Sequence, residues 1–523
     1  MRIIKPNPVT SQSFQHGQHA TFGAHSMITP NVARSRSAGF LAIIVGLTTL
    51  SVGPTATAQV ASKLPTPAEL LDKMIRDFTP RVPSDVDKSL KEQLEAQKKF
   101  AEVQLQFDIL SWETFVALCW PTDKASKPLP KISDAGDPAF DHYFTDTDVF
   151  PADPNDQAPK PTKPRQNRRL INVLKLAGID PGDRVLTLIS STGGELRHPE
   201  FSQAFKWPIW DQNGFMVRYE ILVNDEERNY VWNNGLETLN GQVKFSQAGK
   251  VVDFPIGSFG KSPIGAMEVK LAWKVLADSD DASRFLLANA KILGADGKPK
   301  TVKAGLVGMH IAHKTETSPQ WIWSTFSHVD SLRANALATN PKNGKPLTPL
   351  FTNPGNETAP VNVPSATSNF KDGLPPTQVL QLTPIPQATE EVNRKAQSAL
   401  HAANSVLQYF ELLNTQWPTD PKAKPTPGGP GTAPGSITNK SGGNPTPVYL
   451  VNPLFETYFQ QGNQSASGQE EGNPSDNQRV FGTESCMGCH SSAAVAVAKW
   501  KKQTFFGPQL TGDFSWLLQT KAH

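Results

Sequence analysis

Hydrophobic and polar residues follow a helical period in the first part of the chain beyond residue 60. Thr66-Pro67-Ala68-Glu69 has the form of a capping box with proline at the first helical position, and it predicts a helix start. Ser84 or Asp85 is expected to cap a longer helix, which Pro121 ends. The apolar stripe of that helix comprises Val86, Leu90, Leu94, Ala101, Leu105, Ile109, Trp112, Val116 and Cys119. We therefore predict an N-terminal helical region over residues 59–164.

The hydrophobic period changes to two between residues 165 and 346. In MEVKLAWKV (267–275), apolar residues alternate with polar ones, which is typical of a half-buried strand. Further strand candidates are RVLTLI, FMVRYEILV, RFLLANAKIL, GLVGMHIAHKT and QWIWSTFSHV. No helix is expected between these strands, so we predict a β-rich body, either an antiparallel sheet or a sandwich.

A second helical pattern is predicted at 391–417, after a Pro/Ser/Thr/Asn-rich connection at 347–390. Its apolar face comprises Ala396, Ala399, Leu400, Ala403, Leu407, Phe410 and Leu413, and we interpret His401 beside it as solvated. A Pro/Gly-rich linker at 418–447 leads to a terminal segment, 448–523, which we expect to be helical. The predicted fold class is α+β, with N-terminal helices, a β-rich central body and a C-terminal helical segment.

The terminal segment contains Cys486-Met487-Gly488-Cys489-His490, a C-x-x-C-H sequence that is the attachment signature of c-type haem. Two thiols on one helical turn can each reach a vinyl group of the same porphyrin, and the following imidazole can reach the iron. We expect Cys486 and Cys489 to bind one haem c covalently, with His490 as the proximal iron ligand.

Two other interpretations of the cysteine pair were weighed. A dithiol redox pair usually follows a strand of a βαβ unit, whereas a polar, Gly-containing stretch precedes Cys486. A zinc site needs four ligands, and the sequence has no second cysteine pair. Cys119, the remaining cysteine, is interpreted as a small apolar residue at a helix end.

Residues 1–58 resemble an export signal, as covalent haem of this kind requires. Arg34 and Arg36 precede an apolar run at 38–50, and a small-x-small cleavage site at 56–58 predicts a mature chain from Gln59. The apolar run is too short to span a bilayer comfortably, so we predict cleavage, no membrane span afterwards and a periplasmic location. The start codon corresponds to Met1 or Met27.

The net charge of the mature chain argues against nucleic acid as a partner. The formal net charge is +3, and residues 1–58 carry four basic residues and no acidic ones, which leaves −1 on the mature chain. A near-neutral protein is a poor binder of nucleic acid. The expected partner is a redox protein or a small electron donor or acceptor.

The sixth position of the iron has no obvious ligand near the motif. Only 33 residues follow His490 and none is methionine, so the haem pocket must use earlier sequence, the Ala396–Leu413 helix and the β-rich body. The Ala-rich run after His490 is expected to form a helix close to the porphyrin, and aromatic residues of the tail could shield it: Phe505, Phe506, Phe514 and Trp516.

The candidates for the sixth ligand lie in two strand candidates, and an empty position stays open. His310 and His313 are three apart in a strand, so they point to opposite faces and cannot grip one ion, whereas Met309 shares the face of His313. The candidates are His310, His313, Met309 and His328.

Several motifs together resemble a family of large bacterial proteins known only as cytochrome c family proteins. They are FDILSWETFVALCWP, GLVGMHIAHKTETSPQWIWSTFSHVD, YFELLNTQWP, LVNPLFETYFQ and CMGCH, and they span most of the mature chain. The resemblance implies an exported protein with one haem, held by Cys486, Cys489 and His490. The family pattern has asparagine before the Trp-Pro near residue 119, so Cys119 departs from it and no role is carried over there.

One-electron transfer is the expected activity. The alternative is a haem-dependent oxidoreductase that acts on peroxide, oxygen or a small molecule at an open iron site. A third interpretation is a sensor or binding module whose β-rich body recognises a partner. A vacant sixth position in a polar pocket would favour the enzyme, and a docking surface remote from the haem would favour the binding module.

Overall fold

The structure is a computed structural model, and its described residues all belong to one unit that runs from Lys63 to His523. It describes residues 64–76, 78–150, 160–165, 183–186, 207–293, 298–332, 349–353, 355–356, 358–365, 371–419, 421, 448–460, 485–501, 503–508 and 511–523. The predicted export signal at 1–58 lies outside these residues, and so does nearly all of the predicted linker at 418–447.

The first helix begins where its capping box predicts. Helix α1 spans Pro67–Arg76. The backbone N–H of Thr66 donates to the Glu69 carboxylate over 2.7 Å, and the backbone N–H of Glu69 donates to the Thr66 hydroxyl over 3.3 Å. Both halves of the capping box are present, so the prediction is confirmed.

The single long helix predicted after Ser84 is wrong, because the chain forms two helices there. Helix α2 spans Lys88–Ala96 and α3 spans Phe100–Leu118, with Lys98 between them in the left-handed region (φ 57°). Neither predicted cap is used: Asp87 caps α2, and the Asp85 carboxylate instead accepts from the backbone N–H of Thr317 over 2.9 Å. Buried Cys119 closes α3, as predicted.

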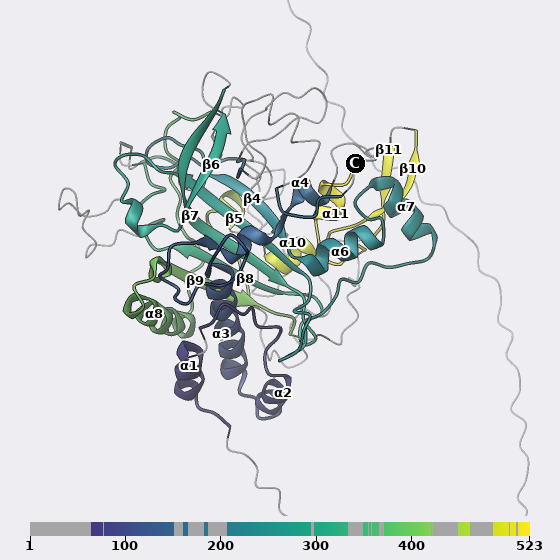
Figure 1. Cartoon of the computed structure of the whole chain (residues 1–523), viewed down its shortest axis with the longest axis horizontal. Helices are drawn as coiled ribbons and strands as arrows, with labels where there is room; N and C mark the ends of the chain where they lie inside the picture. The colour runs from purple at the N-terminus through teal and green to yellow at the C-terminus, as the bar shows by residue number, and fades with distance from the viewer. Residues whose placement is uncertain are drawn as a thin grey trace, which may run out of the picture. The chain divides into compact units, whose positions relative to one another are not determined.

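An antiparallel sheet forms the body of the protein, as predicted (Figure 1). Its strands are hydrogen-bonded in the order β3-β4-β5-β7-β8-β9, and β6 pairs with β7. The bounds are β3 Phe144–Thr145, β4 Arg218–Val223, β5 Met267–Val275, β6 Leu287–Leu293, β7 Pro299–His313, β8 Ile322–His328 and β9 Phe410–Gln416.

One detail of the predicted β-rich body is wrong. Helices α6 (Asp225–Asn233) and α7 (Leu239–Gln247) lie between β4 and β5, where no helix was expected. Of the strand candidate RVLTLI only residues 184–186 are described, and Val185 there makes a parallel bridge to Lys291.

The helix predicted at 391–417 is correct only in its first part. Helix α8 spans Gln387–Ala402, and Asn404 then takes a left-handed conformation (φ 53°). A 3-10 turn (η4, Val406–Tyr409) leads into β9, which adds to the sheet beside β8. The spacing of Leu407, Phe410 and Leu413 suits a helix, but pairing with β8 satisfies the backbone and buries these side chains equally well.

The C-terminal segment is mixed rather than helical. Helix α10 spans Cys486–His490 and α11 spans Leu517–Thr520, and a hairpin of β10 (Ala496–Trp500) and β11 (Gln503–Phe506) lies between them. The helix predicted in the Ala-rich run after His490 is therefore wrong. Remaining short elements are β1 Pro121–Thr122, β2 Asp137–Pro138, η1 Ala139–His142, α4 Asp146–Val149, η3 Ala282–Arg284 and η6 Thr457–Phe459.

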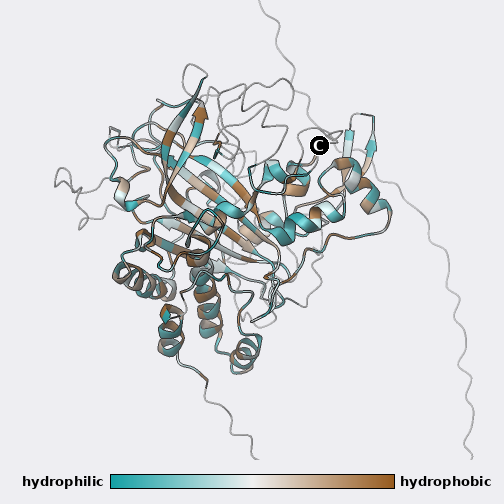
Figure 2. Ribbon diagram, viewed as in Figure 1, coloured by the Kyte–Doolittle hydropathy of each residue, from teal (hydrophilic) through white to brown (hydrophobic). Residues whose placement is uncertain are grey.

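Each face of the sheet is covered by different elements. On one face, α3 and α8 pack against alternate residues of β5 and β7, including Leu271, Met309 and Ile311. On the other face, Ala312 of β7 and Trp323 of β8 share a core with α6, α7 and the C-terminal segment. The helices in Figure 2 carry both hydrophobic and hydrophilic residues, as expected for helices packed on one side of a sheet.

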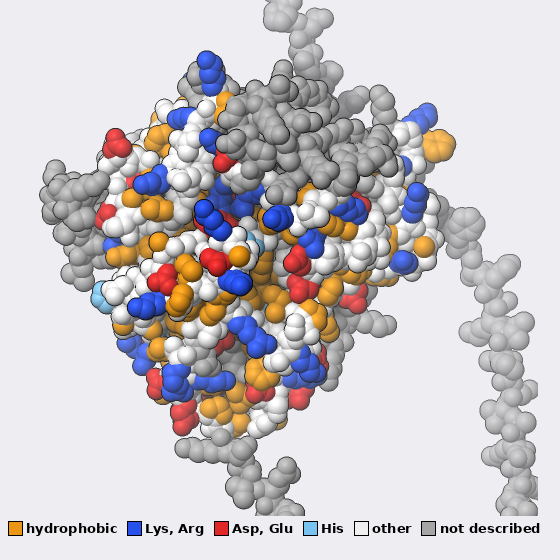
Figure 3. All heavy atoms as spheres, viewed as in Figure 1, with side chains coloured by type: hydrophobic (Ala, Val, Ile, Leu, Met, Phe, Trp, Pro, Cys, Tyr) orange, Lys and Arg blue, Asp and Glu red, His pale blue; other side chains and the backbone are white. Residues whose placement is uncertain are grey.

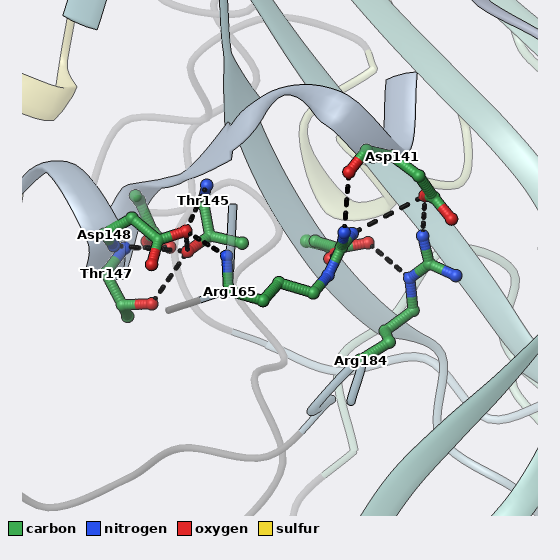
Figure 4. Close-up of polar contacts among 8 residues, drawn as sticks. Asp141, Thr145, Thr147, Asp148, Arg165 and Arg184 are labelled. Carbon is green, nitrogen blue, oxygen red and sulfur yellow. Dashed lines mark hydrogen bonds and ion pairs between the residues drawn. The ribbon is translucent and has the colours of Figure 1, made fainter. Parts of the chain in front are cut away.

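A buried ionic cluster joins β4 to segments that precede it (Figure 4). Glu220 accepts from Arg165 over 2.8 Å and from Arg184 over 2.9 Å, and Asp141 pairs with both arginines. Burial raises the pKa of the Glu220 carboxyl, but the two guanidinium groups outweigh it and lower that pKa to about 2. At neutral pH the positive charges of the two arginines are therefore balanced by the negative charges of the two carboxylates.

In the described part of the chain, no helix is both long enough and apolar enough to cross a bilayer.

Candidate haem-attachment site

The C-x-x-C-H sequence forms one helical turn, α10, which is hydrogen-bonded to the last residue of β9. The Gln416 side chain donates to the Ser485 hydroxyl over 2.6 Å and accepts from the backbone N–H of Met487 over 2.8 Å. Met487 is fully buried in the core beneath the turn, while Cys486 and Cys489 are partly exposed. Residues three apart on a helical turn are neighbours, so Cys486 and Cys489 have the spacing that attachment to a single porphyrin requires.

The environment of Cys486 favours a protonated thiol. Its Sγ donates to the Leu450 carbonyl over 3.5 Å. Burial, followed by the charges of Glu456 and Cys489, raises the pKa of Cys486 well above its usual value. Among the described residues, no three His, Cys, Asp or Glu side chains are placed to hold a metal ion together.

His490 is held in the tautomer that an iron ligand needs. Its Nδ1 lies 2.7 Å from the backbone carbonyl oxygen of Phe514, and a carbonyl can only accept, so Nδ1 carries the proton. Burial, opposed by that hydrogen bond, lowers the pKa of His490 to about 4. A neutral imidazole with a lone pair on Nε2 results, and these are the properties of a metal-ligating histidine.

The loop that supplies this carbonyl was not anticipated from the sequence. Asp513 (φ 49°) and Phe514 (φ 67°) both take left-handed conformations. The Asp513 carboxylate accepts from Lys314 Nζ over 2.5 Å and from the backbone N–H of Phe254 over 2.7 Å. Trp321 Nε1 donates to the Asp513 carbonyl over 3.0 Å. No local sequence signal marks this loop, because its contacts come from residues about 190 to 260 positions earlier.

The motif packs on the sheet rather than on α8. The ring of Trp323, on β8, lies 4.2 Å from the ring of His490. By contrast, Ala396 and Leu400 of α8 belong to the core on the opposite face of the sheet. The expectation that the Ala396–Leu413 helix contributes to the pocket is therefore wrong, while the β-rich body does border the motif.

Three of the four candidates for the sixth ligand lie on the face of the sheet opposite the motif or have ring nitrogens that are hydrogen-bonded to other groups. Met309 is buried in the core against α3 and α8. His313 lies on the same side of β7, and its Nε2 bonds the Ile264 carbonyl over 2.7 Å. His328 Nε2 bonds the Arg284 carbonyl over 2.9 Å, and its Nδ1 accepts from the backbone N–H of Asp330 over 3.2 Å.

His310 is the candidate that lies on the face of the motif. Its Nε2 lies 3.1 Å from a carboxylate oxygen of Glu456, and its ring lies 4.0 Å from that of Phe455. Burial raises the pKa of Glu456, but His310 outweighs it and lowers that pKa below the usual range. The charge of Glu456 also acts on His490 and on Cys486.

The other residues singled out in the sequence are structural. Trp112 and Phe115 are fully buried in the core beneath α3 and α8. His401 is exposed and its Nδ1 lies 2.7 Å from the Gln408 side chain, as a solvated histidine would. Among the tail aromatics, Phe514 is buried beside Met487, whereas Phe505 on the hairpin is 42% exposed.

No family model, curated protein or solved structure matches this chain. The resemblance to cytochrome c family proteins therefore rests on the quoted motifs alone.

Proposed function

We propose that this chain is an exported c-type cytochrome that carries one covalently attached haem and transfers electrons. The observation that carries the proposal is the hydrogen bond between His490 Nδ1 and the Phe514 carbonyl, directly after two cysteines on one turn. This bond leaves Nε2 unprotonated, as in a metal-ligating histidine, whereas a dithiol redox pair has no need of a neighbouring histidine prepared in this way.

The chain would hold the haem through three residues. Cys486 and Cys489 would form the thioethers, and His490 Nε2 would bind the iron on the proximal side. When bound, the haem would supply an iron that cycles between the ferrous and ferric states. The protein would contribute burial, the Phe514 carbonyl and the nearby charge of Glu456, all of which tune a reduction potential.

Export to the periplasm and the class of partner belong to the same proposal. The signal pattern at 1–58 predicts a mature protein that begins at Gln59. On the face shown in Figure 3, acidic and basic side chains are interspersed, which argues against nucleic acid as the partner. The proposed partner is a redox protein or a small electron donor or acceptor. N-terminal sequencing of protein from a periplasmic extract is expected to start at or near Gln59; recovery only with membranes would contradict cleavage.

Haem staining after denaturing electrophoresis tests the attachment. The double variant Cys486→Ala, Cys489→Ala is expected to be exported without haem staining, and His490→Ala to give little mature holoprotein. Cys119→Ala is the matched control, since that thiol is buried in the core beneath α3 and should leave staining intact. Staining that survives in the double variant would exclude the proposed attachment.

A haem-dependent oxidoreductase is the second candidate, and one observation favours it. The imidazole of His310, hydrogen-bonded to the Glu456 carboxylate near the motif, could pass protons to and from a small substrate. Electron transfer comes first because it needs no further group beyond the haem and its axial positions. Rapid turnover of peroxide by the haem-bearing protein would reverse this order.

A further inference from the structure

We propose that His310 is the sixth iron ligand, so that two histidines hold the iron from opposite sides. This inference rests on the proposed function, because it presumes a haem attached at Cys486 and Cys489. It assigns the position that the sequence leaves open among His310, His313, Met309 and His328.

The register of the sheet places His310 beside the motif. In the antiparallel pair of β7 and β8, His310 lies opposite Thr325 and Ala312 lies opposite Trp323. His310 and Trp323 are thus diagonal neighbours on one face; such neighbours lie roughly 7–8 Å apart, with their Cβ atoms somewhat closer. Since the ring of Trp323 lies against that of His490, Trp323 is a neighbour of both histidines.

The chain segment before the motif completes the arrangement. Leu450 accepts from the backbone N–H of Cys486 over 3.2 Å, and six residues later Glu456 reaches His310. The backbone N–H of Asn452 donates to the second Glu456 oxygen over 2.8 Å, and its side chain donates to the Thr325 hydroxyl over 2.7 Å. One short segment therefore connects the attachment cysteine to the strand that carries His310.

The hydrogen bond between His310 and Glu456 gives His310 the tautomer and orientation of a metal ligand. An ionised carboxylate can only accept a hydrogen bond, so the contact of 3.1 Å assigns the ring proton to Nε2 and the lone pair to Nδ1. Either ring nitrogen of a neutral imidazole can bind a metal. A carboxylate behind a histidine orients the ring and makes it a stronger donor.

Glu456 is consequently a positioning residue that acts through His310. The opposite ring, His490, is oriented in the same way by the Phe514 carbonyl. With both axial positions occupied by the protein, small molecules would bind only by displacing His310. This property distinguishes an electron carrier from an enzyme with an open iron site.

The test is the spin state of the iron in the purified, exported holoprotein. Absorption and electron paramagnetic resonance spectra of the wild type are expected to show low-spin iron with two nitrogen ligands. His310→Ala is expected to stain for haem yet become high-spin and bind carbon monoxide, with low spin restored by added imidazole. His401→Ala, which removes an exposed histidine from α8, is the matched control and should keep the wild-type spectrum.

Two further variants separate ligation from general damage to the fold. His310→Met supplies another iron ligand at the same place, so low-spin iron with a raised reduction potential is expected. Glu456→Gln keeps the side-chain shape but weakens the support of His310. It should allow carbon monoxide to displace His310 at about 10- to 100-fold lower concentration.

The outcomes distinguish this inference from the proposed function. Haem-stained wild type that is high-spin, or stained His310→Ala that stays low-spin, would overturn the role of His310 while leaving haem attachment in place. Wild-type protein without covalent haem would overturn both.

Discussion

The Nδ1 atom of His490 lies 2.7 Å from the backbone carbonyl oxygen of Phe514, and this contact links the C-x-x-C-H turn to the last part of the chain. Phe514 and Asp513 present that carbonyl from left-handed conformations, each of which costs about 1–2 kcal/mol for a residue with a side chain. The cost is offset by tertiary contacts of Asp513 with Lys314 and Trp321. The orientation of the proximal histidine therefore depends on the sheet and its following loop.

Removal of Lys314 should destabilise the loop that orients His490. Lys314 is buried and contacts Asp513 over 2.5 Å, so Lys314→Met would leave a carboxylate buried without its cation. Burial raises the pKa of Asp513 to about 6, and loss of Lys314 should raise it further. We expect the free energy of unfolding to fall by about 3–5 kcal/mol at neutral pH, measured by urea denaturation.

Asp253 provides the control for this prediction. It contacts the same Lys314 nitrogen over 2.6 Å, but its side chain is 83% exposed. Asp253→Asn should therefore cost less than about 1 kcal/mol. Equal losses for the two variants would show that the buried pair with Asp513 has no special part in stability.

A pair of buried carboxyl groups predicts a second effect, one that depends on pH. Burial and the neighbouring carboxyl of Glu268 raise the pKa of Glu227 well above its usual value. Glu227 Oε2 and Glu268 Oε1 are buried without a hydrogen-bond partner among the described residues, so a shared proton would satisfy both. In the unfolded chain Glu227 ionises at its ordinary pKa, so its contribution to stability is lost as pH rises from there toward the folded pKa.

Glu227→Gln removes this titration and still offers Glu268 an N–H donor. Relative to the wild type, its free energy of unfolding should rise with pH above about 4.5, by at most about 1.4 kcal/mol per pH unit. Urea denaturation at several pH values measures the difference. Asp225→Asn, at the exposed start of the same helix, is the control and should show no comparable trend. A pH-independent difference for Glu227→Gln would contradict a shared proton.

Local signals in the sequence predicted the elements that depend on them. The alternation of Met267 to Val275 corresponds to β5, and the capping box at Thr66 corresponds to the start of α1. The apolar spacing of Leu407, Phe410 and Leu413 failed, because β9, which pairs with β8, buries side chains on both of its faces, so that burial there does not depend on a helical period. Local pattern cannot decide between the two when tertiary pairing does.

The site shows the same division between local and long-range information. The parity of β7 predicts that His310 and His313 face opposite ways, and the separate contacts of the two residues agree with it. Which face carries the motif depends on how α10 packs against Trp323, and no residue pattern encodes that contact. The contact of His490 with the Phe514 carbonyl could not be predicted from the sequence, because every residue has a backbone carbonyl and the sequence does not show which one a side chain will contact.

The ionic cluster in Figure 4 predicts a large loss of stability when its central carboxylate is neutralised. Glu220 contacts both Arg165 and Arg184, and all three side chains are largely buried. Glu220→Gln would leave two guanidinium groups with only Asp141, so we expect a loss of about 3–5 kcal/mol by urea denaturation. Glu391→Gln, in an exposed pair with Arg394, should cost about 0.5 kcal/mol or less. Similar losses for both variants would mean that burial adds nothing to the cluster.

Buried neutral histidines predict the response of the protein to acid. Burial lowers the pKa of His313 to about 4, from the usual 6.5, although its hydrogen bond to the Ile264 carbonyl opposes the change. As pH falls below 6.5, His313 becomes protonated in the unfolded chain but stays neutral in the folded protein. The free energy of unfolding therefore falls until about pH 4, where the folded protein is protonated as well. A difference of this size corresponds to about 3 kcal/mol.

Because other groups titrate in the same range, the useful quantity is the difference between the wild type and His313→Asn, which cannot titrate. At pH 8 both chains are neutral at this position, and the difference in free energy of unfolding reports only the lost packing and hydrogen bond. Between pH 7 and pH 4 that difference should shrink by up to about 3 kcal/mol, and it could change sign. Denaturation curves at pH 8, 7, 5.5 and 4.5 measure it. A constant difference across these values would mean that His313 is protonated as readily in the folded protein as in the unfolded chain.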